Sequence, residues 1–162
     1  MSTLLEVKDL KTFFKVGLDK TAKAVNGVSF NLYKGKTLAL VGESGCGKTQ
    51  TAFSLIRLIA KNGFHPSGQI IFNKKDLSRL SETEMRSIRG NDISMIFQEP
   101  MTSLNPLYRI GNQLEEPLYQ HQKIAKGPAR KLAIELLDQV GIPDPDKRVD
   151  CFPHELSGGM KQ

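Results

Sequence analysis

The sequence predicts an α/β fold that gives way to helices in its last third. Two nearly continuous apolar runs, residues 37–41 and 93–97, have the pattern of strands buried on both faces of a parallel sheet. A glycine-rich loop follows the first run and opens an amphipathic helix expected over residues 48–60. We therefore predict an α/β nucleotide-binding core over residues 1–100 and a helical domain over residues 101–162.

The strands expected at the N-terminus are short and alternate apolar with polar residues. Residues 5–8 and 24–30 have this pattern, and residues 17–20 supply a turn between them. A second turn at 34–36 precedes the first buried run. Pro66, Ser67 and Gly68 turn the chain into a strand at 69–72, which we expect to be one arm of a hairpin.

Three helices have recognisable ends or faces. In the helix at 48–60, the residues expected to face the sheet are Ala52, Leu55, Ile56 and Ile59. Ser81 with Glu84 forms a capping-box pattern, which opens a short helix that Gly90 ends. A later helix has Pro128 in its first turn and Gly141 as its stop. Its expected apolar stripe consists of Leu132, Leu136, Leu137 and Val140.

Composition and charge count against nucleic-acid-binding, membrane-spanning and secreted proteins. The net charge is +6, but the lysines are scattered and form no basic run, so we do not expect a nucleic-acid partner. No apolar stretch approaches the roughly 20 residues of a membrane-spanning helix, and the N-terminus lacks a secretory signal. Cys46 and Cys151 lack metal-ligand spacing and suit a reducing compartment. We expect a cytosolic protein that can dock onto a membrane protein.

The glycine-rich loop matches the phosphate-binding pattern G-x-x-x-x-G-K-[ST], the P-loop. It consists of Gly42, Glu43, Ser44, Gly45, Cys46, Gly47, Lys48 and Thr49. The glycines let the backbone curl so that its N–H groups point at phosphate oxygens, and the following helix presents its positive end to the same anion. Lys48 would contact the β- and γ-phosphates, and the Thr49 hydroxyl would bind Mg²⁺. The sequence therefore predicts ATP and Mg²⁺ as ligands.

A P-loop alone also suits a small kinase, a GTPase or a DNA-repair ATPase, and two further motifs decide between these classes. Residues 95–100, MIFQEP, and residues 156–162, LSGGMKQ, resemble the Q-loop and the signature sequence of ABC ATPases. The wider segments 98–106 and 152–160 resemble the peptide/nickel importer branch of that family. The resemblance covers essentially the whole chain. It implies the ABC-ATPase fold, with an N-terminal antiparallel β subdomain, part of a RecA-like core and a helical subdomain.

The resemblance also implies roles for single residues. Lys48 and Gln98 would be catalytic, with Gln98 joining Thr49 at Mg²⁺ and its loop contacting the membrane-embedded partner. Gln50 would complete the ATP-binding loop. Adenine would stack on Phe14, or less favourably on Phe13, with Val25 beside it. The residues expected to reach the γ-phosphate on an opposite ATPase subunit are Ser157, Gly158 and Gly159.

The partners implied are a second, related ATPase subunit, two membrane permease subunits and, indirectly, a substrate-binding protein. The protein would lie at the cytoplasmic face of the bacterial inner membrane. The signature departs from the wider family at Met160, which is normal for this branch, and has Lys161 where the branch usually has arginine. The transported solute, a dipeptide, an oligopeptide or nickel, stays open.

Family members continue beyond the signature with a strand that ends in the Mg²⁺-anchoring aspartate and the catalytic glutamate, and later a switch histidine. None of these follows Gln162 in this sequence. We therefore expect the 162-residue chain to bind ATP without turnover, to lack the middle of its sheet and to fold poorly alone. The alternatives are a non-catalytic remnant or regulatory fragment and a soluble ABC protein that acts on nucleic acid or ribosomes.

Overall fold

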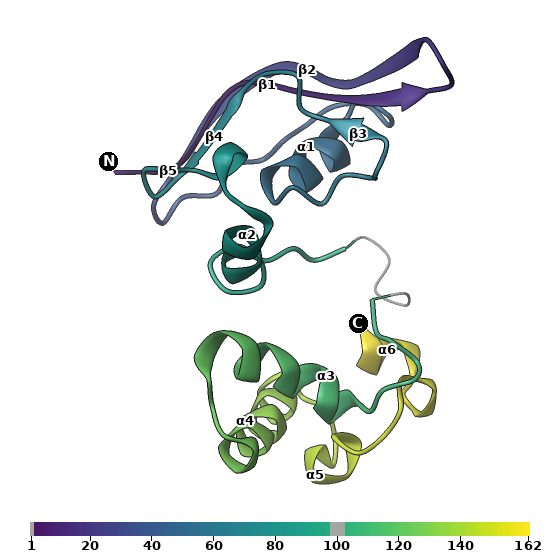
Figure 1. The fold of residues 1–162 in the computed structure, drawn as a ribbon. Helices are drawn as coiled ribbons and strands as arrows, with labels where there is room; N and C mark the ends of the chain where they lie inside the picture. Colours follow the sequence, from purple (N-terminus) through teal and green to yellow (C-terminus); the bar gives the residue numbers. More distant parts are fainter. Residues whose placement is uncertain (1, 98–102) are drawn as a thin grey trace. The chain divides into compact units, whose positions relative to one another are not determined.

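The computed structural model describes residues 2–97 and 103–162, which form two compact units. Unit 1 is Met1–Arg89, and unit 2 is Gly90–Gln162. Unit 1 contains a sheet with helix α1 against one face, and the elements of unit 2 in the described residues are helices (Figure 1). Because each unit closes its own core, each is described by itself.

Within the described residues, five antiparallel strands form the sheet of unit 1. A long hairpin joins β1 (Thr3–Val16) to β2 (Lys20–Tyr33) through the turn predicted at 17–20. On its other edge β1 pairs with β3 (Gly63–Phe64) and with β4 (Gln69–Phe72), and β4 continues into β5 (Lys75–Asp76). The predictions of an antiparallel N-terminal subdomain and of a hairpin arm at 69–72 are confirmed.

The apolar face of this sheet follows from its register. Val7 lies opposite Phe30 on one side and Ile70 on the other, and both Val7 and Ile70 are buried. Register shifts interrupt the β1–β2 ladder, one of them between Thr12 and Phe13. Such bulges bend and twist a hairpin, which lets the long ribbon curve over the helix beneath it.

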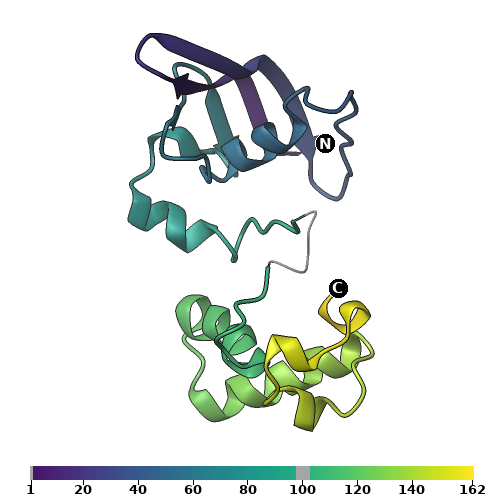
Figure 2. The ribbon, with the colours of Figure 1, turned by 90° about the vertical axis from the view of Figure 1, so that its right-hand side faces the viewer.

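The two apolar runs at 37–41 and 93–97 are not strands, so this part of the prediction is wrong. The first run is coil after the turn at 34–35, and the second is coil after a bridge at Ile93. Val41 and Ile96 are 93% and 96% exposed. Figure 2 shows the first run looping out between β2 and α1. A buried parallel strand needs hydrogen-bonded neighbours. In the described part of the chain no strand pairs with either run.

Helix α1 (Lys48–Leu55) is shorter than predicted because the chain turns left-handed at Arg57, whose φ is 53°. Leu58 N–H donates to Phe53 O and Arg57 N–H to Ser54 O, which is the Schellman pattern that ends a helix. The buried residues of α1 are Thr51 and Ser54. The predicted inward stripe is correct for Ile56, which is buried just after the helix, and for the half-buried Leu55, which shares a hollow with Leu5 and Phe30 of the sheet. Ala52 and Ile59 are half-buried.

Helix α2 (Glu82–Ile88) begins with the predicted capping box. Ser81 Oγ accepts from Glu84 N–H, and the Glu84 carboxylate accepts from Ser81 N–H at 2.8 Å. Arg89 follows α2 and donates from Nε to Ile56 O at 2.6 Å, so it satisfies a carbonyl at the end of α1. Its ion pair with Glu82 lowers the pKa of that carboxylate, mainly through the hydrogen bond that Arg89 donates.

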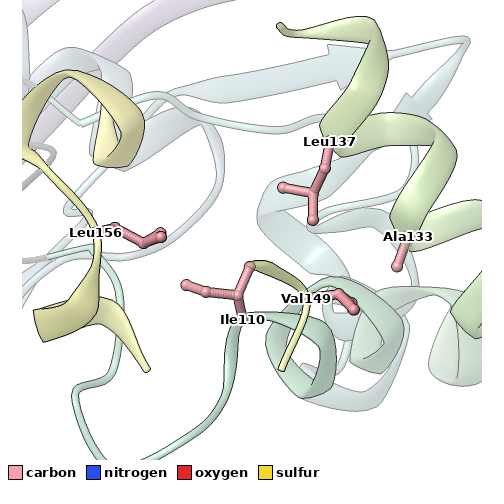
Figure 3. Packing of buried hydrophobic residues seen from close by; sticks show 5 residues of the cluster. All are labelled: Ile110, Ala133, Leu137, Val149 and Leu156. Carbon is pink, nitrogen blue, oxygen red and sulfur yellow. The ribbon is translucent and has the colours of Figure 1, made fainter. Parts of the chain in front are cut away.

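Unit 2 is built of short helices around one apolar cluster. They are α3 (Ile110–Pro117), η3 (Leu118–Gln122), α4 (Lys126–Gln139), α5 (Pro145–Arg148), η4 (Pro153–Glu155) and α6 (Gly158–Lys161). A further short helix, η1 (Leu77–Arg79), belongs to unit 1. The cluster consists of Ile110, Ala133, Leu137, Val149 and Leu156 (Figure 3). Leu156 is the first residue of the signature segment and comes directly before Ser157, so the core of unit 2 anchors the start of that segment.

The buried face of α4 differs from the predicted stripe. It consists of Ala129, Ala133 and Leu137, spaced four residues apart, while Leu136 and Val140 are 38% and 74% exposed. Small alanines allow α3 to pack closely on α4. The predicted stop is confirmed, because Gly141 N–H donates to Asp138 O after the last turn.

The start of α3 receives its hydrogen-bond acceptors from a distant segment. Ile110 N–H donates to Cys151 O at 2.9 Å, and Gly111 N–H donates to Val149 O at 2.7 Å. These N–H groups belong to the first turn of a helix, which has no acceptors of its own. A Cβ at Gly111 would lie 2.7 Å from Val149 Cγ2 and 2.8 Å from Val149 O. Only glycine permits this approach.

We therefore expect Gly111→Ala to lower the free energy of unfolding of unit 2 by about 1–3 kcal/mol through overpacking. Gly127→Ala is the matched control, since a Cβ there meets nothing within 4 Å and alanine favours a helix by about 0.5–1 kcal/mol. Urea denaturation followed by amide exchange in α3 and α4 measures both effects. Equal stability of the two variants would contradict this account.

Candidate phosphate-binding site

The predicted P-loop joins the coil after β2 to α1 and is tightly curled. Cys46 N–H donates to Glu43 O at 3.3 Å, and a Cβ at Gly42 would lie 2.6 Å from Cys46 Sγ. Gly47, which caps α1, has a φ of 95°, and a Cβ there would lie 2.3 Å from the carbonyl oxygen of Ala24 on β2. The loop is therefore held against the sheet at a position where a side chain has no room.

Lys48 lies inside the curl of this loop. Its ammonium donates to Gly42 O and to Glu43 O, both at 2.7 Å, and lies 3.6 Å from Cys46 Sγ. An ammonium has three donors and no acceptor. Two carbonyl oxygens thus hold the positive charge where the loop closes, within reach of an anion that enters the curl.

The N-terminus of α1 adds a second attraction for an anion. Its cap, Gly47, has no side chain to accept from the N–H groups of the first turn. These groups and the helix dipole favour negative charge at this end. Thr49 is exposed and Gln50 half-buried in the same turn, so the Thr49 hydroxyl is accessible to a metal ion bound with a phosphate. The residues present fit a nucleoside triphosphate with Mg²⁺.

Comparison with protein families agrees with this geometry. A family model described as ABC transporter matches residues 25–162, which include the loop and the signature segment. The chain belongs to the ABC transporter family. In the described residues, no helix has both the length and the apolar character needed to cross a membrane.

Two curated relatives of this ABC chain are peptide transport proteins. The oligopeptide transport ATP-binding protein OppD of Bacillus subtilis is 53% identical over 163 residues, which cover 100% of this chain and 45% of the relative. The dipeptide transport ATP-binding protein DppD of the same organism is 51% identical and covered to 48%. The chain spans about half the length of the curated relatives it matches.

Solved structures show the same fold. A dimeric ATP-binding cassette in a post-hydrolysis state, bound to ADP and Pi, superposes with a TM-score of 0.79 at 22% identity. The superposition covers 97% of this chain and 65% of that one. A second dimeric structure of a bacterial ABC transporter cassette gives a TM-score of 0.77. The predicted ABC-ATPase fold is therefore confirmed.

The residues predicted to hold adenine lie on the hairpin of this ABC chain. Phe14 is half-buried and covers Gly63, where an added Cβ would lie 2.7 Å from its ring. Phe13 packs edge-to-face on Phe64, with ring centroids 6.1 Å apart. Val25 is only 3% exposed and follows Ala24, whose carbonyl touches the loop. Adenine stacking on Phe14 stays a prediction.

The other residues to which the resemblance assigns a role are Gln98 and the signature residues, which lie far from the P-loop in sequence. Gln98 lies outside the described residues. Ser157 caps α6, and its Oγ accepts from Met160 N–H at 3.4 Å. Ser157, Gly158 and Gly159 are exposed in unit 2, whereas the P-loop belongs to unit 1. Neither unit contains both the loop and the signature.

Sequence reasoning missed the residues that support the loop from behind. Thr12 and Ser54 are buried and hydrogen-bonded to each other at 2.7 Å between β1 and α1, although 42 residues separate them. The signal available was weak, because Thr12 lies outside the strands predicted from the sequence and Ser54 lies outside the predicted inward stripe of the helix. In a pattern analysis, such polar residues count against burial.

We expect Gly47→Ala to destabilise unit 1 more than Gly45→Ala. Both positions have positive φ, which costs alanine about 1–2 kcal/mol. Only at Gly47 does the new Cβ also meet a backbone carbonyl, at 2.3 Å. Thermal unfolding of the two variants measures the difference, and a Gly47→Ala variant as stable as Gly45→Ala would rule out the close contact with β2.

Proposed function

We propose that the chain is the ATP-binding subunit of an importer for peptides, in which ATP binding and hydrolysis drive transport through a membrane pore. The observation that carries this proposal is the Lys48 ammonium, held by two carbonyls inside a curled loop at the N-terminus of α1. The relatives at 53% and 51% identity are named as oligopeptide and dipeptide transport proteins, which supports peptides as the solute.

In this proposal Lys48 binds the β- and γ-phosphates, and the loop N–H groups and the end of α1 stabilise their charge. Thr49 binds Mg²⁺, and Gln98 contacts the same ion. When bound between these residues and the phosphates, the ion would supply positive charge that neutralises the phosphate oxygens. Phe14 stacks on adenine, with Val25 packed behind it.

The proposed partners are a second ATP-binding subunit and two membrane permeases, with a substrate-binding protein acting indirectly. Two observations support a second subunit. Ser157 and its two glycines are exposed on a unit that lacks a P-loop, and both structural relatives are dimeric. The subunit would lie peripherally at the cytoplasmic face of a bacterial membrane, without a nucleic-acid partner.

For the 162 residues alone, the proposal is ATP binding without turnover, because the resemblance assigns the catalytic glutamate to a segment beyond the signature. A non-catalytic role that occupies the permease or the partner ATPase is the second candidate. The exposed signature residues also suit it. Permease binding without ATPase activity in the assembled complex would favour this second candidate.

We expect Lys48→Ala to weaken binding of a fluorescent ATP analogue by at least about tenfold, because a charge-assisted contact of 1.4 kcal/mol or more is lost. Lys36→Ala, an exposed lysine outside the loop, should bind like the unaltered chain. Equilibrium titration with Mg²⁺ present measures both variants. Unchanged affinity in Lys48→Ala would reject the proposed site.

Cys46 offers a chemical test of the same loop. Its thiol is exposed and lies 3.6 Å from the Lys48 ammonium. Alkylation of Cys46 should abolish binding of the ATP analogue because the adduct fills the curl, and bound nucleotide should slow the reaction. Modification of Cys151, which lies in unit 2, should not change affinity. Full nucleotide binding after complete Cys46 modification would count against the site.

A further inference from the structure

Behind α1, a chain of hydrogen bonds runs from a histidine to the first turn of the helix. His65 Nδ1 lies 3.1 Å from Thr12 Oγ1 and 3.2 Å from Lys11 O. Thr12 Oγ1 lies 2.7 Å from Ser54 Oγ, and Ser54 Oγ–H donates to Gln50 O at 2.5 Å. Gln50 follows Thr49 in the P-loop helix.

Which group donates and which accepts in this series of hydrogen bonds follows from its two ends. Gln50 O only accepts, so the single Ser54 proton is used there, and Ser54 Oγ must accept from Thr12. Lys11 O also only accepts, so His65 Nδ1 carries a proton. Thr12 Oγ1 then accepts from His65 and donates to Ser54. The single Nδ1 proton of His65 is shared between Lys11 O and Thr12 Oγ1, and these two acceptors fix the Nδ1–H tautomer of His65.

This arrangement leaves the other ring nitrogen of His65 without a partner. Nε2 is buried and has no hydrogen bond to any of the described residues. A neutral Nε2 only forgoes an acceptor contact, whereas a protonated Nε2 would bury a positive charge and an unpaired donor. The charged group that acts on the ring is Arg57 after α1, while Lys11 on β1 faces it with its backbone carbonyl and turns its ammonium to Asp9. Neither cation can accept this proton.

We propose that His65, acting through Thr12 and Ser54, is a positioning residue for the P-loop helix, and that its protonation weakens nucleotide binding. The inference rests on the proposed function and adds a proton-linked control to the same site. A protonated ring would move toward water and release Thr12, so that the buried Thr12–Ser54 bond between β1 and α1 loses its support. The turn that carries Thr49 and Gln50 would then be less firmly placed.

The direction of the pH effect agrees with the environment of the ring. Burial lowers the pKa of His65 below its ordinary value, and the Arg57 charge acts in the same direction against a backbone hydrogen bond with Lys11. The unfolded chain therefore binds a proton at higher pH than the folded chain. The His65 contribution to stability is present above pH about 6.5 and is lost as the pH falls below it.

The test compares the full chain with three variants in titrations with a fluorescent ATP analogue and Mg²⁺ at pH 7.5 and pH 5.5. In His65→Asn the amide nitrogen is three bonds from Cα, as Nδ1 is in histidine, and the amide does not titrate. His65→Leu removes the donor. His121→Asn changes a histidine of unit 2. Circular dichroism at each pH confirms that the chains are folded. Because ATP phosphates also titrate in this range, the informative quantity is the difference between chains.

We expect the Kd of the unaltered chain and of His121→Asn to rise about fivefold more, between pH 7.5 and pH 5.5, than that of His65→Asn. His65→Leu should bind more weakly than His65→Asn at pH 7.5. Identical pH profiles for the unaltered chain and His65→Asn would overturn the inference while leaving the proposed function intact. A folded chain that fails to bind the analogue at pH 7.5 would overturn both. Should the unaltered chain unfold at pH 5.5, its melting temperature must fall with pH more steeply than that of His65→Asn, and equal slopes would refute the inference.

Discussion

The contact between Gly47 and the Ala24 carbonyl is the constraint on which the rest of the candidate site depends. A Cβ at Gly47 would lie 2.3 Å from that oxygen, so the start of α1 approaches β2 as closely as a backbone can. The contact fixes the point at which the coil after β2 turns into the helix. The curl of the loop, the place of the Lys48 ammonium and the free first turn of α1 all follow from it.

The helix is fixed on the sheet by polar as well as apolar contacts. Ser54 and Thr12 are fully buried, and each has its hydroxyl paired, so they incur no cost of an unsatisfied polar group. Oriented hydrogen bonds specify one rotation of a helix, whereas apolar contacts tolerate several. In the proposed site Lys48 and Thr49 point at one anion, and a polar anchor behind the P-loop helix would then have a functional reason that apolar packing does not supply.

How much of this could be predicted depends on the range of the interactions involved. The capping box at Ser81 and the stop at Gly141 are local and are confirmed, and the P-loop is a local motif whose role as a phosphate site stays a prediction. The run at 37–41 was predicted as a strand from its apolar pattern, but a strand also needs partners that no pattern within the run supplies. The predicted stripe of α4 is correct at Leu137 and otherwise differs from the buried face for a related reason, because close packing against α3 selects alanines over larger leucines. The link from His65 through Thr12 to Ser54 joins residues too distant in sequence for any local pattern.

The division into two units also bears on the proposed contact between ATPase subunits. Unit 2 holds the segment before Ser157 by its core residue Leu156 and by the bonds from α3 to residues 149–151, all within the unit. Unit 1 holds its phosphate-binding loop against its own sheet. In each unit, the contacts that hold the predicted segment come from residues of the same unit. If Ser157 and its glycines reach a phosphate on another subunit, as proposed, the core residue Leu156 already fixes the start of that segment, which lowers the entropic cost of the encounter.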